Sequence, residues 1–305
     1  IPAEFQARYK DLHASLIETV VSVDDAVMER YLADEKIGHD EIARCFTKGV
    51  LSGAVVPVMC VCAEKDIGVK ELLHVIVEEA PSPLQELHKL RRKAPDKPGG
   101  YEEKPLVPAA DGPFYAQVFK SMRDPFLGKL SFVRVYSGAL PTGGIAKSSS
   151  ATKPDKFAHV LEVQGKDMKE KEGMVCGDIV AVAKNENLNF GDTLSTDESG
   201  WVLEPIPVPV PMQALAVEAK NRNDEAKIAQ RLKTLAEGDP TFIVEVDPQT
   251  HELVVRGMGQ THLDLMLQRL KKQQLEVNTR PPKIPYRSTI GGTAEATYAH
   301  KKQSG

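Results

Sequence analysis

The stretch from Thr241 to Arg256 reads TFIVEVDPQTHELVVR and predicts a β-hairpin. Two apolar runs, Thr241–Val246 and Glu252–Arg256, lie on either side of the turn Asp247–Thr250. Short apolar and β-branched runs separated by Asp and Pro are typical of strands joined by a turn. We therefore place the centre of a β-sheet here, and the sequence on both sides of the hairpin indicates what covers that sheet.

A strand and a helix are predicted before this hairpin, and a helix and a strand after it. In both helices the apolar residues recur at three- and four-residue spacing, which puts them on one face. The predicted elements are the strand Ala214–Val217, a helix from near Asn223 to Gly238, a helix carrying Leu263, Met266, Leu267 and Leu270, and the strand Leu275–Asn278. The order βαββαβ is that of the split-βαβ or ferredoxin-like unit, which we expect over residues 209–284. This fold alone does not specify a chemistry.

Residues 112–205 predict a separate β domain. Short alternating or apolar runs are separated by Gly, Pro and Asp turns, a pattern typical of a sandwich or a barrel. The runs are Tyr115–Lys120, Lys129–Tyr136, Phe157–Val163 and Asp178–Ala183. We interpret the glycine-bearing stretch Ser137–Gly144 as a turn, because it lacks the Gly-Lys-Ser/Thr ending of a phosphate-binding loop.

The first 83 residues predict helices followed by one strand–helix unit. Residues 1–50 have helical spacing, and the apolar run Ala54–Val61 predicts a buried strand. After a turn, the apolar residues between Val69 and Val77 predict a helix that the prolines at 81 and 83 would stop. We interpret this as the last βα unit of an α/β domain that begins outside the chain. The Pro- and Lys-rich residues 84–111 are predicted to be a linker, so the fold class is multidomain α/β plus β.

The composition is that of a globular protein. The 305 residues are 41% hydrophobic and 27% charged, and the formal net charge of −4 excludes a global basic field for nucleic acid. No window approaches the roughly 18 apolar residues that a membrane span needs. The four cysteines match no common zinc spacing, and we expect them to be reduced in a cytoplasmic protein. We recognise no nucleophile motif or paired-carboxylate spacing, so no catalytic or metal-binding residues are predicted.

The ends and the charge distribution add two expectations. The chain begins at Ile1 without an initiator Met or a signal pattern, so we expect an internal piece of a longer protein. Basic residues cluster in two runs, one from His88 to Lys97 and one from Arg269 to Arg287. Such runs are commonly solvated faces, and contact with nucleic acid is the alternative.

Several motifs, in one order along the chain, resemble those of elongation factor G, a translational GTPase. The stretch Phe132–Leu140 resembles the barrel signature of translational GTPases, and Glu237–Phe242 and Gly257–Leu263 are similar to two signatures of the factor's third domain. Pro285–Ile290 resembles the entry to its fourth domain, and Met28–Gly49 the end of its G-domain insertion. The resemblance covers essentially the whole chain. It implies the tail of a G domain over 1–83, a β-barrel domain II over 112–205, a domain III over 209–284 and the start of domain IV over 285–305.

Two stretches depart from the family pattern. Val163–Glu170 stands where the family commonly has a Met-His-Ala-Asn-like stretch. Gln260 and Thr261 stand where the third-domain signature has Glu and Leu. These differences indicate a divergent elongation-factor-G-like paralogue.

The resemblance implies a fragment of a GTP-dependent ribosomal factor that moves tRNA and mRNA on the ribosome. GTP and Mg²⁺ would bind to the full-length parent, where the loop at Cys62, Ala63 and Glu64 corresponds to a guanine contact. The chain contains no phosphate loop, switch segment or Asn-Lys-x-Asp motif. We therefore expect this piece to bind no cofactor and to be inactive alone.

The implied partners are the ribosome, through rRNA and ribosomal proteins, and tRNA and mRNA in the parent, which we expect to be monomeric. Arg269, Lys271 and Lys272 are the candidate contacts for rRNA phosphates, whereas His262 is interpreted as a structural, hydrogen-bonded residue. A ribosome-recycling or ribosomal-protection relative is one alternative, although the insertion-like residues 1–50 argue against a protection protein. A stand-alone RNA- or ribosome-binding module is the other, although residues 54–80 would then leave a sheet edge exposed.

Overall fold

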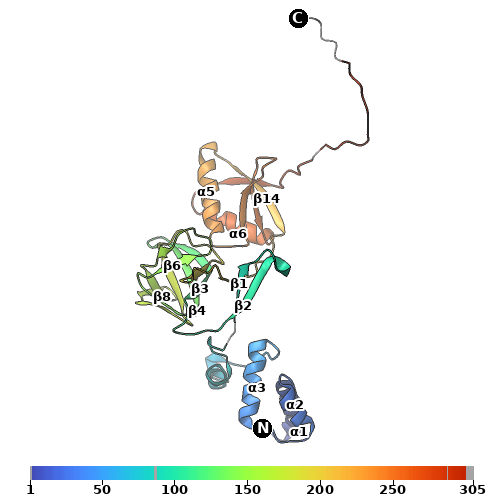
Figure 1. Ribbon diagram of the computed structural model, residues 1–305, viewed down its shortest axis with the longest axis vertical. Helices are drawn as coiled ribbons and strands as arrows, with labels where there is room; N and C mark the ends of the chain where they lie inside the picture. Colours follow the sequence, from blue (N-terminus) through green and yellow to red (C-terminus); the bar gives the residue numbers. More distant parts are fainter. Residues whose placement is uncertain (1, 86–87, 287, 300–305) are drawn as a thin grey trace. The chain divides into compact units, whose positions relative to one another are not determined.

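The structure is a computed structural model that describes residues 2–85, 88–286 and 288–299. The chain divides into two compact units, Ile1–Ile206 and Pro207–Gly305, and each is described by itself. Figure 1 shows helices in the first part of the chain, then β structure, then a domain in which helices and strands combine.

Three helices form the beginning of the first unit, as predicted. They are α1 (Gln6–Val21), α2 (Asp25–Leu32) and α3 (His39–Ser52), preceded by a 3₁₀ turn over Ala3–Phe5. Helix α3 follows Gly38, whose N–H donates to the Glu41 carboxylate at 3.4 Å, and it ends at Gly53, which has a φ of 75°. Val21 and Cys45 are buried, so a small apolar core forms in this part of the chain.

The predicted buried strand at Ala54–Val61 is wrong. These residues, all of them described, form neither helix nor strand, and Val56 and Val58 are 75% and 89% exposed. An apolar run becomes a buried strand only when neighbouring strands pair with it, and none does so in the described part of the chain. The predicted helix does form, as α4 (Val69–His74), and continues as a π turn over Val75–Glu79.

The predicted linker at 84–111 is also wrong, because the described residues of this stretch contain a β-hairpin. Strands β1 (His88–Lys93) and β2 (Tyr101–Leu106) pair antiparallel, and β13 (Val202–Leu203) adds a third strand beside β1. One face of this sheet is buried in a cluster of large side chains. The cluster consists of Leu90, Leu106, Tyr115, Trp201 and Leu203.

The predicted β domain forms between residues 115 and 195 and is barrel-like. Its longest strands are β3 (Tyr115–Asp124) and β4 (Gly128–Ser137), at the centre of an eight-stranded sheet in the order β7-β6-β12-β3-β4-β11-β8-β9. The others are β6 (Ile145–Ser148), β7 (Asp155–Lys156), β8 (Val160–Gln164), β9 (Asp167–Glu170), β11 (Ile179–Ala183) and β12 (Thr193–Ser195), with a separate pair of β5 (Ala139–Pro141) and β10 (Gly173–Val175). Residues from eight of these strands, including Val118, Val133 and Val182, share one buried core, as the interior of a barrel requires.

Gly138 is required where β4 turns into β5. Its φ is +70°, and a Cβ at this position would lie 2.5 Å from the carbonyl oxygen of Gly112. Its own N–H donates to the Ala109 carbonyl at 2.7 Å, and its carbonyl accepts from Cys176 at 2.9 Å. The glycine loop predicted to be a turn is therefore a structural corner.

The second unit confirms the predicted βαββαβ order. Its elements are β14 (Gln213–Ala219), the 3₁₀ turn Arg222–Asp224, α5 (Glu225–Ala236), β15 (Ile243–Val246), β16 (Leu253–Gly257), α6 (Gln260–Lys271) and β17 (Val277–Arg280). The sheet order is β15-β16-β14-β17, and every neighbouring pair is antiparallel, which makes β14 and β15 parallel. Ile228 and Leu232 of α5 and Leu263, Met266 and Leu270 of α6 pack with Val217 and Val255 of the sheet. This is the ferredoxin-like arrangement.

After β17, the described residues 281–286 and 288–299 form neither helix nor strand. The stretch Pro285–Ile290, which resembles the entry to a fourth domain, includes position 287, and this position and 300–305 lie outside the described residues. Among the helices that the structure describes, none is long and apolar enough to cross a membrane.

Candidate functional site

The predicted guanine-contact loop is a tight turn. Cys62 and Ile67 exchange two backbone hydrogen bonds of 2.9 and 3.1 Å, and a 3₁₀ turn over Ala63–Lys65 lies between them. Ala63 and Glu64 are exposed at its tip. Gly68 follows with a φ of 73°, and a Cβ there would meet the Cys60 carbonyl oxygen at 2.5 Å. The loop is thus held by its backbone, and the identity of the residue at position 62 matters less than the turn itself.

The predicted RNA-contact residues lie together at the end of α6. Arg269 and Lys271 are in its last turn, Lys272 caps it, and all three are exposed. Cations at this position interact favourably with the negative end of the helix dipole, which gives them a structural role as well. The arrangement can present positive charge to a phosphate, but it does not form an enclosed site.

His262 joins the two stretches that resemble third-domain signatures. Its Nδ1 accepts from the Met258 N–H at 3.2 Å, and its Nε2 lies 3.1 Å from Asp239 Oδ2. Because Nδ1 is an acceptor, Nε2 carries the proton that is donated to Asp239, as in a neutral imidazole. The side chains of His262 and Asp239 are 18% and 28% exposed. The prediction of a structural, hydrogen-bonded histidine is confirmed.

Asp239 is the centre of this contact. Its Oδ1 accepts from the Thr241 N–H at 2.9 Å and from the Thr241 hydroxyl at 2.6 Å. Burial alone would raise the pKa of this carboxyl, but the hydrogen bonds from Thr241 and the contact with His262 outweigh it, so the pKa of Asp239 is lowered. The carboxylate therefore fixes the end of α5 to the start of α6 through two different loops.

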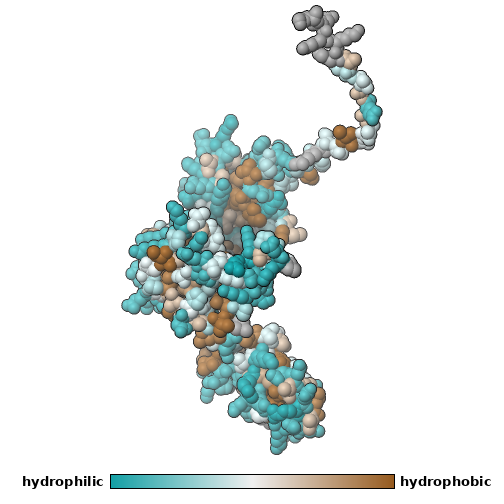
Figure 2. All heavy atoms as spheres, in the orientation of Figure 1, coloured by the Kyte–Doolittle hydropathy of each residue, from teal (hydrophilic) through white to brown (hydrophobic). Residues whose placement is uncertain are grey.

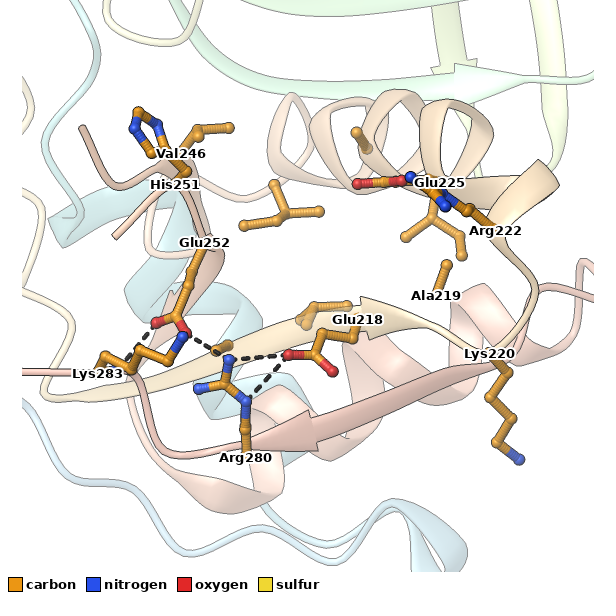
Figure 3. A pocket seen from close by; sticks show the side chains of 15 residues that line it. Glu218, Ala219, Lys220, Arg222, Glu225, Val246, His251, Glu252, Arg280 and Lys283 are labelled. Carbon is orange, nitrogen blue, oxygen red and sulfur yellow. Dashed lines mark hydrogen bonds and ion pairs between the residues drawn. The ribbon is translucent and has the colours of Figure 1, made fainter. Parts of the chain in front are cut away.

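A cavity of about 650 Å³ opens where the sheet of the second unit separates (Figure 3). The ladder between β14 and β16 ends at the pair Ala216 and Val254, although β14 continues to Ala219. The walls come from α5, β14 and the β15–β16 turn, with His251 at one rim and Arg222 at the other. The predicted site residues do not line this cavity.

The charged residues at the floor of the cavity neutralise one another. Figure 3 shows Arg280 between two carboxylates, and its Nη2 lies 2.8 Å from Glu218 and in contact with Glu252. Glu252 also accepts from the Lys283 N–H at 2.9 Å. That bond, and then Arg280, lower the pKa of Glu252 against the effect of burial. Since the carboxylates are held by cations, this group is a structural clamp, and the described residues contain no group of three or more potential metal ligands.

Sequence reasoning missed this clamp. Glu252 and Arg280 are 28 residues apart and come together only because β16, β14 and β17 are neighbours in the sheet. The spacing of residues along the sequence does not predict an ion pair between Glu252 and Arg280. The pair could be predicted only from the order of the strands in the sheet.

Comparison with known proteins follows the domain organisation of the chain. Residues 113–197 match the family model "Elongation factor G domain 2", and residues 208–281 match "Elongation Factor G, domain III". The whole chain is 36% identical over 306 residues to the elongation factor G of Orientia tsutsugamushi strain Ikeda and likewise to that of strain Boryong. The chain belongs to the elongation factor G family. It spans 43% of the length of these curated relatives.

A solved structure also aligns with nearly the whole of this chain. A crystal structure of a protein from Thermus thermophilus superposes with a TM-score of 0.72 at 30% identity. The superposition covers 94% of this chain and 40% of the other. The translation-factor barrel and the ferredoxin-like domain that the sequence predicts are therefore confirmed as elongation factor G domains.

Proposed function

We propose that this chain is part of a GTP-dependent ribosomal translation factor of the elongation factor G type, which moves tRNA and mRNA on the ribosome in the cytoplasm. The observation that carries the proposal is the match of the barrel and the ferredoxin-like domain, in that order, to two domains of one factor, together with a relative that aligns over the whole chain. The chain would supply domains that contact the ribosome and transmit the nucleotide state.

GTP and Mg²⁺ are proposed ligands of the longer protein. To the GTP site this chain would contribute the turn at Cys62, Ala63 and Glu64, whose backbone would contact the guanine base. Support comes from the form of the turn, which its backbone bonds with Ile67 fix. Phosphate and Mg²⁺ binding need groups that the sequence of this chain does not contain, so we expect a titration of the chain alone to show no GTP binding.

The ferredoxin-like domain is the proposed moving element of the relay. The chain divides at Ile206 and Pro207, within a stretch that has prolines at 205, 207, 209 and 211. GTP can shift the equilibrium between two arrangements of this domain only if the longer protein binds GTP with a different affinity in each arrangement. Small-angle scattering of the longer protein with GDP and with a non-hydrolysable GTP analogue is expected to give two different profiles. Identical profiles would contradict the relay.

Ribosome binding tests the function of this chain directly. The chain should sediment with ribosomes, and an excess of elongation factor G should displace it, because both would occupy the same site. A ribosomal-protection or ribosome-recycling relative would be displaced as well, and only a translocation assay with the longer protein separates these. A stand-alone RNA-binding module would remain bound in the presence of elongation factor G, and that result would overturn the proposal.

A further inference from the structure

The clamp on the floor of the cavity also holds the segment that follows β17. We call residues 281–286 the exit segment. Glu252 Oε2 accepts from the Lys283 N–H at 2.9 Å, and Glu252 Oε1 lies 3.6 Å from the Lys283 ammonium. The same carboxylate contacts Arg280, the last residue of β17 (Figure 3). One carboxylate therefore binds the chain both before and after the two prolines at 281 and 282.

The two prolines make the start of the exit segment stiff. A proline fixes its own φ at about −65°, and the residue before a proline is restricted to extended conformations. Arg280 and Pro281 both precede a proline. Because prolines carry no N–H, the N–H of Lys283 is the first main-chain donor after Arg280. The exit segment therefore begins as a short rigid rod, and Glu252 binds the residue at each end of that rod.

The surroundings of Glu252 favour a firm hold on this rod. Its side chain is only 7% exposed, so solvent ions screen its contacts weakly. Arg280 is fixed in turn by Glu218 of β14, which accepts from Nη2 at 2.8 Å and from Nε at 3.0 Å. The hydrogen bond from the Lys283 N–H is the main cause that lowers the pKa of Glu252, so the carboxylate stays charged at neutral pH.

The exit segment carries large apolar side chains. Ile284 and Tyr286 are exposed, as is Ile290 farther along the chain. Figure 2 shows hydrophobic residues along the stretch that follows this domain. Isoleucine is among the residues most often buried in folded proteins. The direction in which the exit segment leaves the sheet therefore decides which surface can cover these side chains.

From these contacts we infer that the clamp is a latch that sets the direction in which the chain leaves the ferredoxin-like domain. In the closed state, Glu252 binds Lys283 and Arg280 and holds the rod against the sheet. In the open state, Lys283 is released and the rod turns about Arg280. The sheet stays paired in both states, because the ladder between β14 and β17 ends at Arg280 and does not include the rod. The latch goes beyond the proposed function, since it controls the course of the chain after this domain without unfolding it.

Hydrogen exchange of single amides, followed by NMR on the whole chain, separates a latch from a clamp that only stabilises the sheet. The N–H of Lys283 reports the latch, and the N–H of Val255, within the ladder of β16, reports the sheet. Glu252→Gln keeps the size of the side chain and removes its charge. The matched control is Glu245→Gln, which removes a carboxylate that pairs with Arg256 at 2.7 Å on the same sheet.

In Glu252→Gln the Lys283 amide should exchange about tenfold faster than in the wild type, because a neutral acceptor holds an N–H less strongly than a charged one. The exchange of Val255 should stay unchanged, and the control should change neither amide. If circular dichroism shows that Glu252→Gln does not fold, Glu252→Asp takes its place. That change keeps the charge but shortens the side chain by one methylene, which takes the carboxylate away from the Lys283 N–H, so the same acceleration is expected.

Three results would overturn the latch. The Lys283 amide could exchange in the wild type as fast as in an unstructured peptide of the same sequence. The control could accelerate it as much as Glu252→Gln does. Val255 could accelerate in proportion to Lys283, which is the behaviour of a clamp that stabilises only the sheet. The measurement uses this chain alone, so a chain with the expected exchange rates that does not bind ribosomes would overturn the proposed function and leave the latch standing.

Discussion

Replacing Tyr115 with Phe should destabilise the first unit by removing one partly buried hydrogen bond. Tyr115 is 1% exposed and packs with Leu90 and Trp201, and its hydroxyl donates to the carboxylate of Asp197. Phe keeps the ring and its packing, so the change isolates the hydroxyl. A hydrogen bond to a charged group contributes about 1.5–3 kcal/mol. Asp197 is partly exposed and keeps a 2.8 Å bond from the Ser199 N–H, so we expect the lower end, about 1.5 kcal/mol.

The single tryptophan makes this measurable. Trp201 lies in the same cluster as Tyr115, so urea unfolding followed by its fluorescence reports this unit. Tyr101→Phe is the control, because Tyr101 is 40% exposed. In the background of Asp197→Asn, the further change Tyr115→Phe should cost much less, since the charged acceptor is already gone. An unfolding midpoint equal to that of wild type, or equal costs in both backgrounds, would refute the reasoning.

The same contact predicts a pH dependence. Hydrogen bonds from Ser199 and then Tyr115 lower the pKa of Asp197 to about 2. Because the folded-state pKa lies below the unfolded value of about 3.9, the stabilisation is present above that unfolded value and is lost as pH falls toward about 2. Between these limits, the stability of Tyr115→Phe should change less with pH than that of wild type. Parallel curves would contradict the assignment.

Three further changes test the packing. Gly138→Ala should cost about 2–3 kcal/mol in urea unfolding of the first unit, because φ is +70° and the new Cβ would lie 2.5 Å from the Gly112 carbonyl oxygen. Leu232→Ala removes a side chain with 0% exposure and should cost about 2–5 kcal/mol, measured by circular dichroism because the tryptophan lies outside this unit. Asp239→Asn turns an amide donor toward the Nε2–H of His262 and so removes their hydrogen bond. The backbone amide hydrogens of residues 257–263 should then exchange with solvent about 5- to 30-fold faster. Unchanged hydrogen exchange would count against the contact between Asp239 and His262.

Apolar periodicity predicted the second unit well because its helices and strands each bury one face. Ile228 and Leu232, spaced by four, are both buried, as the helical spacing requires. The same reasoning failed at Ala54–Val61, because an extended segment that pairs with no strand can also contain a run of β-branched residues. Whether such a run is a strand depends on partners far away in sequence, and periodicity does not report them.

The hairpin of β1 and β2 escaped prediction for a related reason. Its strands are mostly charged, and only Leu90 and Leu106 are buried among their described residues. Their third partner, β13, comes much later in the sequence. Of the candidate site, His262 was predicted to be structural because a lone histidine is more often a hydrogen-bonded structural residue than an RNA contact or a base. The clamp of Glu252 and Arg280 had no local signal, because long-range pairing of strands creates it.

GTP hydrolysis by the longer protein that contains this chain, measured with and without ribosomes, tests the central claim most directly. We predict slow hydrolysis alone, a strong stimulation by ribosomes, and loss of that stimulation when residues 113–281 are deleted from the longer protein. Hydrolysis that ribosomes do not change, or stimulation that survives the deletion, would contradict the account.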